Sequence, residues 1–267
     1  MFEYLHYDFF LNALVGVILI GLCSAIIGTY IITRRMVAIS GGITHACFGG
    51  LGLGYYLGVS PVFMAGVFAV CSGVGVEWMS RRFSLREDSA IAVIWGLGMA
   101  LGVLFVFLTP GYVPELNAFL FGNILTISRA DLWAIGVFTA ILAAFFVWQG
   151  RTIVATAFDR DFATVCGLPV RAVSYAMTVF VAIAIVLTIR LAGIMMLMSM
   201  MSLPIITAEI FTHRYVSVML CSVCFSLLAS LGGLFLSTLV NVPCSALIVL
   251  LMAAIFGVCR LVVALRG

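Results

Sequence analysis

The chain contains no lysine, and its Asp, Glu and Arg residues together make up only 9% of 267 positions. A phosphate-binding loop of the Gly-x4-Gly-Lys-Ser/Thr type requires a lysine, so this kind of nucleotide site is excluded. Histidine occurs three times, in separate regions, with no Ser-His-Asp or His-Glu-x-x-His pattern, and this argues against an enzyme. The net charge of +3 is too small to suggest a nucleic-acid partner.

Cysteine is present but forms no recognisable framework. Most of the eight cysteines are scattered through apolar stretches, where free cysteine behaves as a small hydrophobic residue. Cys221 and Cys224 have the spacing of a redox or zinc pair, but they lie inside an apolar stretch that lacks the usual context for either. We therefore expect packing roles for both, and no disulfide bonds.

Apolar residues make up 65% of the chain. A bilayer core of about 30 Å needs ~20 apolar residues per helix, so the sequence has room for eight or nine spans. The fold class predicted is all-α, a polytopic transmembrane helical bundle in which residues 1–267 form a single transmembrane domain. The candidate spans are 9–32, 38–58, 61–80, 89–109, 131–149, 172–190, 191–211, 216–238 and 243–262. The sixth and seventh run together at Arg190 to Gly193, so eight spans is the alternative.

The arginines predict an orientation. With the N-terminus outside, eleven of the thirteen arginines fall in inner segments, and only Arg129 and Arg190 fall outside. This distribution satisfies the positive-inside rule, whereas the opposite orientation would violate it. We expect a multi-pass membrane protein that is surrounded by membrane lipid.

His45 is the most unusual residue of the predicted spans. It lies in a run without a carboxylate or arginine (37–76), where an ionisable side chain is costly and usually faces the protein interior or an aqueous cavity. Gly41, Gly42 and Gly49 fall about one helical turn away on the same face, which leaves room for a ligand or a neighbouring helix. Neutral imidazole is a common transition-metal ligand, so His45 is a candidate metal ligand. A histidine that hydrogen-bonds across a helix interface is the alternative.

A polar segment on the predicted inner side, Gln149 to Arg171, has the features of a short amphipathic helix. Asp159 and Asp161 suit the positive end of a helix dipole. Phe158, Phe162 and Val165 recur at helical spacing, and Gly167 followed by Pro169 ends the pattern. Such a stripe must lie on lipid headgroups or on a partner protein. The mixed charge favours a protein partner over an anionic membrane surface.

Two further groups have metal-binding chemistry but favour simpler interpretations. Glu209 and His213 share a face at i, i+4 spacing, although Arg214 follows and this end faces water in the predicted topology. Five methionines between Met195 and Met201 could bind cuprous copper, yet without a paired Cys or His they are typical of apolar packing. Pro204 is expected to break or kink the following helix.

Several motifs in this order resemble one known family, over nearly the whole chain. They are Arg34-Arg35-Met36 with Thr44-His45-Ala46, Phe-Gly-Asn-Ile-Leu at 121–125, Ala157-Phe158-Asp159 through Gly167-Leu168-Pro169, and Gly193-Ile194 through Leu203-Pro204. The sequence is similar to the membrane permease subunits of bacterial zinc/manganese/iron ABC importers, the ABC-3 type. Each motif is loose by itself, but their order and spacing are specific.

The resemblance implies a homodimeric pore that imports zinc, manganese or iron. It further implies cytoplasmic ABC ATPase subunits, which hydrolyse the ATP, and an extracytoplasmic metal-binding protein that delivers the ion. The segment at about 157–168 would be the coupling helix that contacts the ATPase. Its candidate coupling residues are Phe158, Asp159, Asp161, Phe162 and Gly167. No permanently bound cofactor is implied, because the metal ion is cargo.

The resemblance also implies a metal-coordinating pair, a histidine at the position of His45 and an aspartate four residues earlier. This sequence has Gly41 at that earlier position, so a hard oxygen ligand and a negative charge are missing. The change should disfavour manganese relative to metals that prefer imidazole. Near the last span, Asn241 and Ser245 also depart from the family pattern. A permease for a chelate such as a siderophore, haem or cobalamin, or a non-transporting membrane scaffold, is the alternative function.

Overall fold

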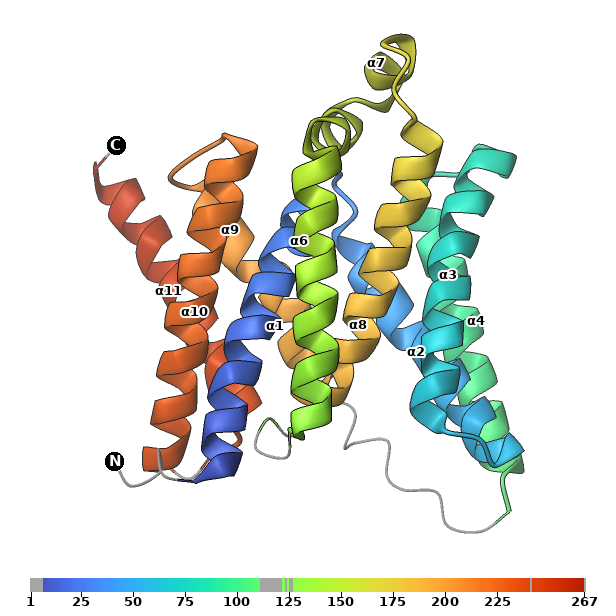
Figure 1. Cartoon of the computed structure of the whole chain (residues 1–267), viewed down its shortest axis with the longest axis horizontal. Helices are drawn as coiled ribbons and strands as arrows, with labels where there is room; N and C mark the ends of the chain where they lie inside the picture. The colour runs from blue at the N-terminus through green and yellow to red at the C-terminus, as the bar shows by residue number, and fades with distance from the viewer. Residues whose placement is uncertain (1–6, 111–121, 123, 125–126, 241, 267) are drawn as a thin grey trace. The chain divides into compact units, whose positions relative to one another are not determined.

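The computed structural model describes residues 7–110, 122, 124, 127–240 and 242–266, and helices dominate this part of the chain. The helices are α1 (Asp8–Thr33), α2 (Val37–Leu57), α3 (Pro61–Phe83), α4 (Glu87–Leu108), α6 (Arg129–Phe158), α7 (Arg160–Val165), α8 (Val170–Met200), α9 (Leu203–Glu209), α10 (Tyr215–Val240) and α11 (Cys244–Arg266). Figure 1 follows them along the chain. The predicted all-α class is confirmed.

Eight candidate membrane spans are present among the described residues, each long and apolar enough to cross a bilayer. The prediction of eight or nine spans is thereby narrowed to eight, because the separate spans expected at 172–190 and 191–211 form one continuous segment, Val170–Glu209. The boundary between them is a kink at Gly193 (φ 78°, ψ 166°), a backbone conformation that glycine adopts readily. Apolar residues continue on both sides of the kink, so no loop leaves the apolar stretch there.

The contacts divide the chain into two compact units. Unit 1 comprises residues 1–32, 117–147 and 187–267, and unit 2 comprises residues 33–116 and 148–186. Both α6 and α8 contribute one part to each unit. The expectation that residues 1–267 form a single domain stays a prediction.

Unit 2 is built around α2, which packs against α3 and α4 at glycines (Figure 1). A Cβ added to Gly50 would lie 2.7 Å from Cα of Ala65, and one added to Gly52 would lie 2.6 Å from the carbonyl oxygen of Gly102. These distances leave no room for a side chain, so the helix backbones are in direct contact. The glycine spacing therefore serves close helix packing, as in other membrane helix pairs.

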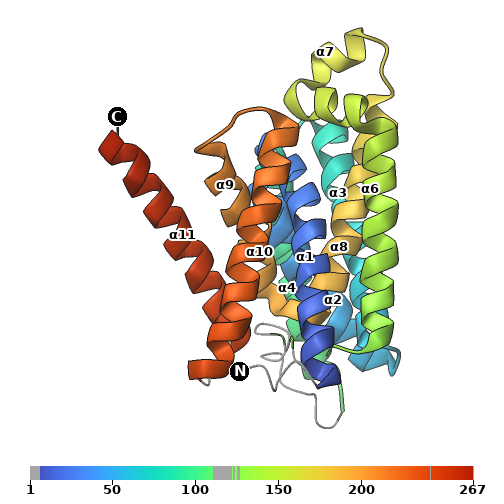
Figure 2. The ribbon, with the colours of Figure 1, turned by 60° about the vertical axis from the view of Figure 1, so that its left-hand side comes forward.

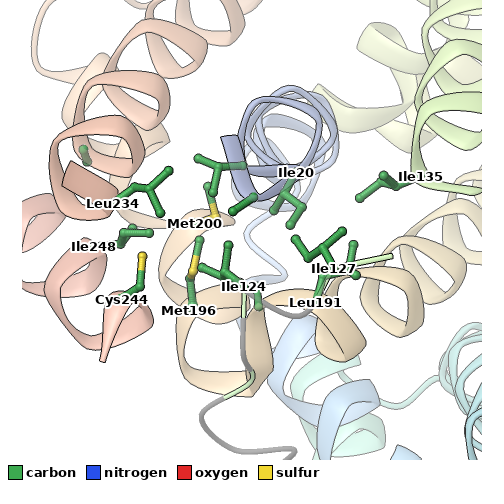
Figure 3. Packing of buried hydrophobic residues seen from close by; sticks show 14 of the residues in the cluster. Ile20, Ile124, Ile127, Ile135, Leu191, Met196, Met200, Leu234, Cys244 and Ile248 are labelled. Carbon is green, nitrogen blue, oxygen red and sulfur yellow. The ribbon is translucent and has the colours of Figure 1, made fainter. Parts of the chain in front are cut away.

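Unit 1 has a core of interdigitating aliphatic and methionine side chains. Figure 3 shows Ile20, Ile124, Met200 and Leu234 pointing toward one another from separate segments. Helix α8 ends at Met200, and α9 begins at Leu203 with Pro204 in its first turn. Because proline lacks the N–H that an uninterrupted helix requires, the break precedes Pro204 as expected.

Candidate functional site

His45 lies in the middle of α2, on the side that faces α4. Its imidazole ring stacks on the indole of Trp95 in α4, with ring centroids 4.5 Å apart and an angle of 5° between the ring planes. The neighbouring Thr44 is buried, and its hydroxyl donates a hydrogen bond to the carbonyl oxygen of Ser40. The stacking orients the imidazole by covering one of its faces.

The Nδ1 atom of His45 is enclosed and has no hydrogen-bond partner within the described part of the chain. A metal ion bonds to an imidazole nitrogen in the plane of the ring, so the stacked indole does not block coordination. Among the residues that the structure describes, however, no cluster of three His, Cys, Asp or Glu side chains surrounds a possible ion. His45 is therefore not part of a multi-ligand metal cluster within the described residues. Gly41 is buried in the same helix and supplies no side-chain ligand.

A buried group of charged side chains lies at the end of unit 2 where α3 stops and α4 starts. The Glu77 side chain is 1% exposed and the Arg34 side chain 4% exposed. Glu77 Oε1 lies 2.7 Å from Nη2 of Arg81, one helical turn later in α3. Glu87, the first residue of α4, lies 2.7 Å from Arg34 Nη2. Burying a carboxylate this completely requires several cationic partners, because desolvation is costly.

Arg160 joins this group from α7. Its Nη1 donates to Glu87 Oε1 at 2.6 Å, and its Nη2 donates to the two carboxylate oxygens of Glu77 at 2.9 and 3.0 Å. Nη2 also lies 3.3 Å from the hydroxyl of Ser174 in α8. Arg34, Glu77, Arg81, Glu87 and Arg160 are called the arginine–glutamate cluster below. It connects α3, α4 and α7 with the turn between α1 and α2.

The predicted coupling helix at about 157–168 is shorter in the structure, and its boundaries need correction. Phe158 is the last residue of α6, and α7 spans only Arg160–Val165. Asp159 separates the two helices because its carboxylate accepts hydrogen bonds from the backbone N–H groups of Asp161 (3.0 Å) and Phe162 (2.9 Å). This is an N-cap, which fixes the start of α7.

Gly167 follows α7 with φ of 73°, a left-handed conformation that terminates helices and favours glycine. Asp161 lies in the first turn of α7, as its predicted interaction with the helix dipole requires. Figures 1 and 2 show α7 beyond the end of α8 to which this turn leads. The local signals in the sequence therefore identified both ends of the element, although not its length.

The apolar residues of this segment are exposed. Phe158 and Phe162 are each 63% exposed, and Val165 is 87% exposed. Only Ala163 of α7 is buried. Large apolar side chains exposed on a short capped helix and on the residue just before it are typical of a surface that binds a partner.

The other sequence candidates do not form sites. Helix α9 ends at Glu209, and His213 lies in the loop beyond, so the two residues do not share a helical face as their spacing suggested. Met196 and Met200 are fully buried in the core of unit 1, as the packing interpretation predicts. Cys221 and Cys224 are free thiols on α10.

The arginine–glutamate cluster was missed by sequence reasoning. One signal was available, because Glu77 precedes Arg81 by four residues, the spacing of an ion pair on a helix, and lies inside a predicted span. No comparable signal links Glu87 with Arg160, which are separated by 73 residues. That contact depends on the tertiary structure.

With this geometry described, comparison with known proteins identifies the family. Residues 6–263 match the model of the ABC 3 transport family. The chain belongs to the ABC 3 transport family. Among its relatives in the family, the manganese transport system membrane protein MntC of Halalkalibacterium halodurans is 30% identical, over 96% of this chain and 87% of that protein. A probable metal transport system membrane protein of Chlamydia pneumoniae is 33% identical, over 85% of this chain and 80% of the other.

Among solved structures, PsaBC from Streptococcus pneumoniae in complex with Fab aligns with a TM-score of 0.82 and 26% identity. The alignment covers 96% of this chain and 94% of that one. This chain is thus an ABC 3 family permease, the membrane subunit of a transporter. Its eight candidate spans are those of a multi-pass protein of the bacterial cytoplasmic membrane.

Proposed function

We propose that this permease imports zinc, manganese or iron ions, and that His45 is a transient ligand on their path. Membership of the ABC 3 transport family supports the cargo class, and the ligand role of His45 rests on its enclosed Nδ1 atom, which has no hydrogen-bond partner among the described residues. Two relatives named as manganese or metal transport proteins support the same class of cargo. A single imidazole binds an ion weakly, and weak binding allows the release that transport requires.

The residue at position 41 is glycine rather than aspartate, and this difference affects which metal we expect to be transported. Manganese prefers oxygen ligands, whereas zinc and iron accept imidazole nitrogen readily. With glycine at this position, the described surroundings of His45 offer nitrogen but no carboxylate from the preceding helical turn. We therefore expect zinc or iron to be transported in preference to manganese.

The test is ATP-dependent uptake of zinc, manganese and iron by vesicles that contain the permease and its ATPase. His45→Ala and His45→Gln should each lower uptake by about tenfold or more, equivalent to ~1.4 kcal/mol. His213→Ala is the matched control, because His213 is exposed in a loop. Glutamine keeps a polar side chain but is a poor ligand for these ions. Normal uptake by His45→Gln would therefore assign His45 to helix packing and overturn its role as a ligand.

The same vesicles separate the proposed cargo from the alternatives. A chelate permease would transport a siderophore, haem or cobalamin and leave the free ions outside. A non-transporting scaffold would move neither ions nor chelates. Uptake of a free ion that competes with other free ions, and is unaffected by chelates, is the result expected here.

We further propose that α7 and the preceding Phe158 dock on a separate cytoplasmic ABC ATPase, which hydrolyses the ATP. The exposed Phe158, Phe162 and Val165 would enter an apolar groove of that partner, while Asp159 and Gly167 fix the ends of α7. Aromatic anchors at such interfaces often contribute about 2 kcal/mol or more. Asp161 would remain at the polar rim of the same surface.

Replacing Phe162 by aspartate should abolish co-purification of the ATPase, because a charge would be buried in the groove. Phe83→Asp is the matched control, since Phe83 is 57% exposed at the end of α3 and lies outside the proposed surface. Equal recovery of the ATPase with both variants would contradict the assignment of α7 as the docking element.

The proposed assembly also contains a second copy of the permease, surrounding membrane lipid, and an extracytoplasmic metal-binding protein. It requires the N-terminus to face outward and α7 to face the cytoplasm. A variant that retains only Cys166, which is exposed at the end of α7, tests this topology. A membrane-impermeant maleimide should label it only after the cells are permeabilised. In a cysteine-free chain, Tyr7→Cys should be labelled in intact cells, and the reverse pattern would invert the topology.

A further inference from the structure

Helix α7 has few contacts that could transmit force to the rest of unit 2. Its side chains are mostly exposed, and Ala163 is the one that is buried. Arg160 is the exception among its polar residues, because its guanidinium reaches the carboxylates of both Glu77 and Glu87. Besides the covalent connections at its two ends, Arg160 therefore provides the strongest described attachment of α7.

The geometry of this attachment is stiff. A guanidinium is planar and holds its terminal nitrogens in a fixed arrangement, and here each of them donates to a different carboxylate. Charge-assisted hydrogen bonds of this kind are roughly twice as strong as neutral ones. Glu77 belongs to α3 and Glu87 to α4, so a displacement of the Arg160 side chain acts on both helices together.

From Glu87, a chain of contacts leads along α4 to His45. Trp95 lies eight residues after Glu87 in α4, about 12 Å along the helix axis. Its indole stacks on the imidazole of His45. Three residues later, Gly98 packs so closely on Ala46 that an added Cβ would lie 2.9 Å from the Ala46 Cβ. A displacement at the start of α4 is thereby carried to α2 at His45 and at the adjacent Ala46.

We infer that Arg160 is the positioning residue that passes the movement of α7 to α3 and α4, and through α4 to His45. This inference rests on the proposed function, because the movement would come from an ATPase docked on α7. Arg160 does not touch the cargo. It acts through the two carboxylates.

From the contacts of the arginine–glutamate cluster, we expect replacement of Arg160 to uncouple metal transport from ATP hydrolysis without unfolding the protein. Without Arg160, Glu77 keeps Arg81 at 2.7 Å and Glu87 keeps Arg34 at 2.7 Å. Each carboxylate therefore retains a cation, and α3 and α4 keep their mutual contacts. The hydrogen bonds from α7 to Glu77, Glu87 and Ser174 are lost.

The experiment measures metal uptake and ATP hydrolysis in parallel, in vesicles that contain the complete transporter. Arg160→Ala should bind the ATPase and hydrolyse ATP within about twofold of the unmodified protein. The number of ions transported per ATP should fall by about tenfold, within the usual range of coupling between two sites. For Arg160→Lys, the number of ions transported per ATP should lie between the values for Arg160→Ala and the unmodified protein. Lysine keeps the charge but not the planar arrangement of donors.

Arg82→Ala is the matched control. Arg82 lies next to Arg81 near the end of α3 and is exposed, and no ion pair involves it in the described part of the chain. The ratio of ions to ATP should be unchanged in this variant. If Arg160→Ala does not accumulate, Arg160→Lys and Glu87→Gln test the same ratio, since each weakens the same connection.

Two results would overturn the inference while leaving the permease assignment intact. An unchanged ratio of ions to ATP in the Arg160 variants would show that α7 acts through other contacts. A parallel loss of hydrolysis and uptake, again with an unchanged ratio, would mean that Arg160 only stabilises the assembly. If the unmodified protein binds no ATPase and transports no ion, the proposed function fails, and the role of Arg160 fails with it.

Discussion

The two units of this permease bury different kinds of contact. In unit 2, helices meet backbone to backbone at glycines, and an almost fully buried glutamate is surrounded by arginines. In unit 1, aliphatic and methionine side chains fill the core, and the ion pair between Asp8 and Arg129 is largely exposed, at 81% and 76%. Unit 2 thus has helices in direct backbone contact, whereas unit 1 contains breaks at Gly193 and before Leu203.

The candidate ligand His45 and the arginine–glutamate cluster lie in the same unit, so a force applied to the cluster need not deform the helices between them. Four substitutions would test the contrast, and two of them have a partner substitution that isolates the contact involved.

The largest effect is expected from Glu77→Gln in unit 2. The change leaves Arg34, Arg81 and Arg160 around a neutral amide, which compensates their charge poorly. Removing one partner of a buried ion pair typically costs ~3–5 kcal/mol. Unfolding of the purified protein in detergent, followed by heating or by added denaturant, would measure the loss. A change below about 1 kcal/mol would contradict the stabilising role of the cluster.

In unit 1, Met200→Ala should cost ~2–5 kcal/mol, because it leaves a cavity in a closely packed core. Met195 provides the control, since it lies in the same helix but is 56% exposed. The same unfolding measurement should show a much smaller change for Met195→Ala. Equal losses would mean that the methionines do not differ in packing.

A smaller but more specific effect is expected from Gly98→Ala in unit 2. The new methyl group would press on the backbone of Ala46, and overpacking of this kind typically costs ~1–3 kcal/mol. Gly96→Ala, two residues earlier, adds a methyl group where nothing lies within 4 Å. It should be neutral or slightly stabilising, because alanine favours helix more than glycine does. Similar unfolding midpoints for the two variants would contradict direct backbone packing.

The smallest effect is expected from Asp8→Asn, which removes the exposed ion pair with Arg129. Exposed pairs contribute between zero and about 1 kcal/mol, and salt screens them. Unfolding midpoints at low and high salt should therefore be nearly the same for this variant and the unmodified protein. A large shift would mean that Asp8 has a further role.

Sequence reasoning was accurate where the relevant physics is local. The spans follow from the apolar length that a bilayer requires, and the described residues contain eight candidates. The ends of α7 follow from Asp159 and Gly167, which act on backbone within three residues. The same reasoning placed Phe158 and Phe162 on one helix, although Asp159 ends the regular pattern between them.

The environment of His45 was predicted only in part. Its unusual position within an apolar span is visible in the sequence, and so are the glycines beside it. The stacked Trp95 is not visible, because it lies fifty residues away on another helix. The prediction that His45 contacts metal remains to be tested by transport.

The sequence by itself determined that this protein crosses a membrane repeatedly, and where a short capped helix interrupts the spans. Those outcomes depend on hydropathy and on hydrogen bonds between neighbouring residues. Only the tertiary structure decided that Arg160 would bind Glu77 and Glu87, which lie 83 and 73 residues away in the chain. An arginine can pair with any carboxylate within reach, so the choice of partner depends on which helices pack together in the tertiary structure.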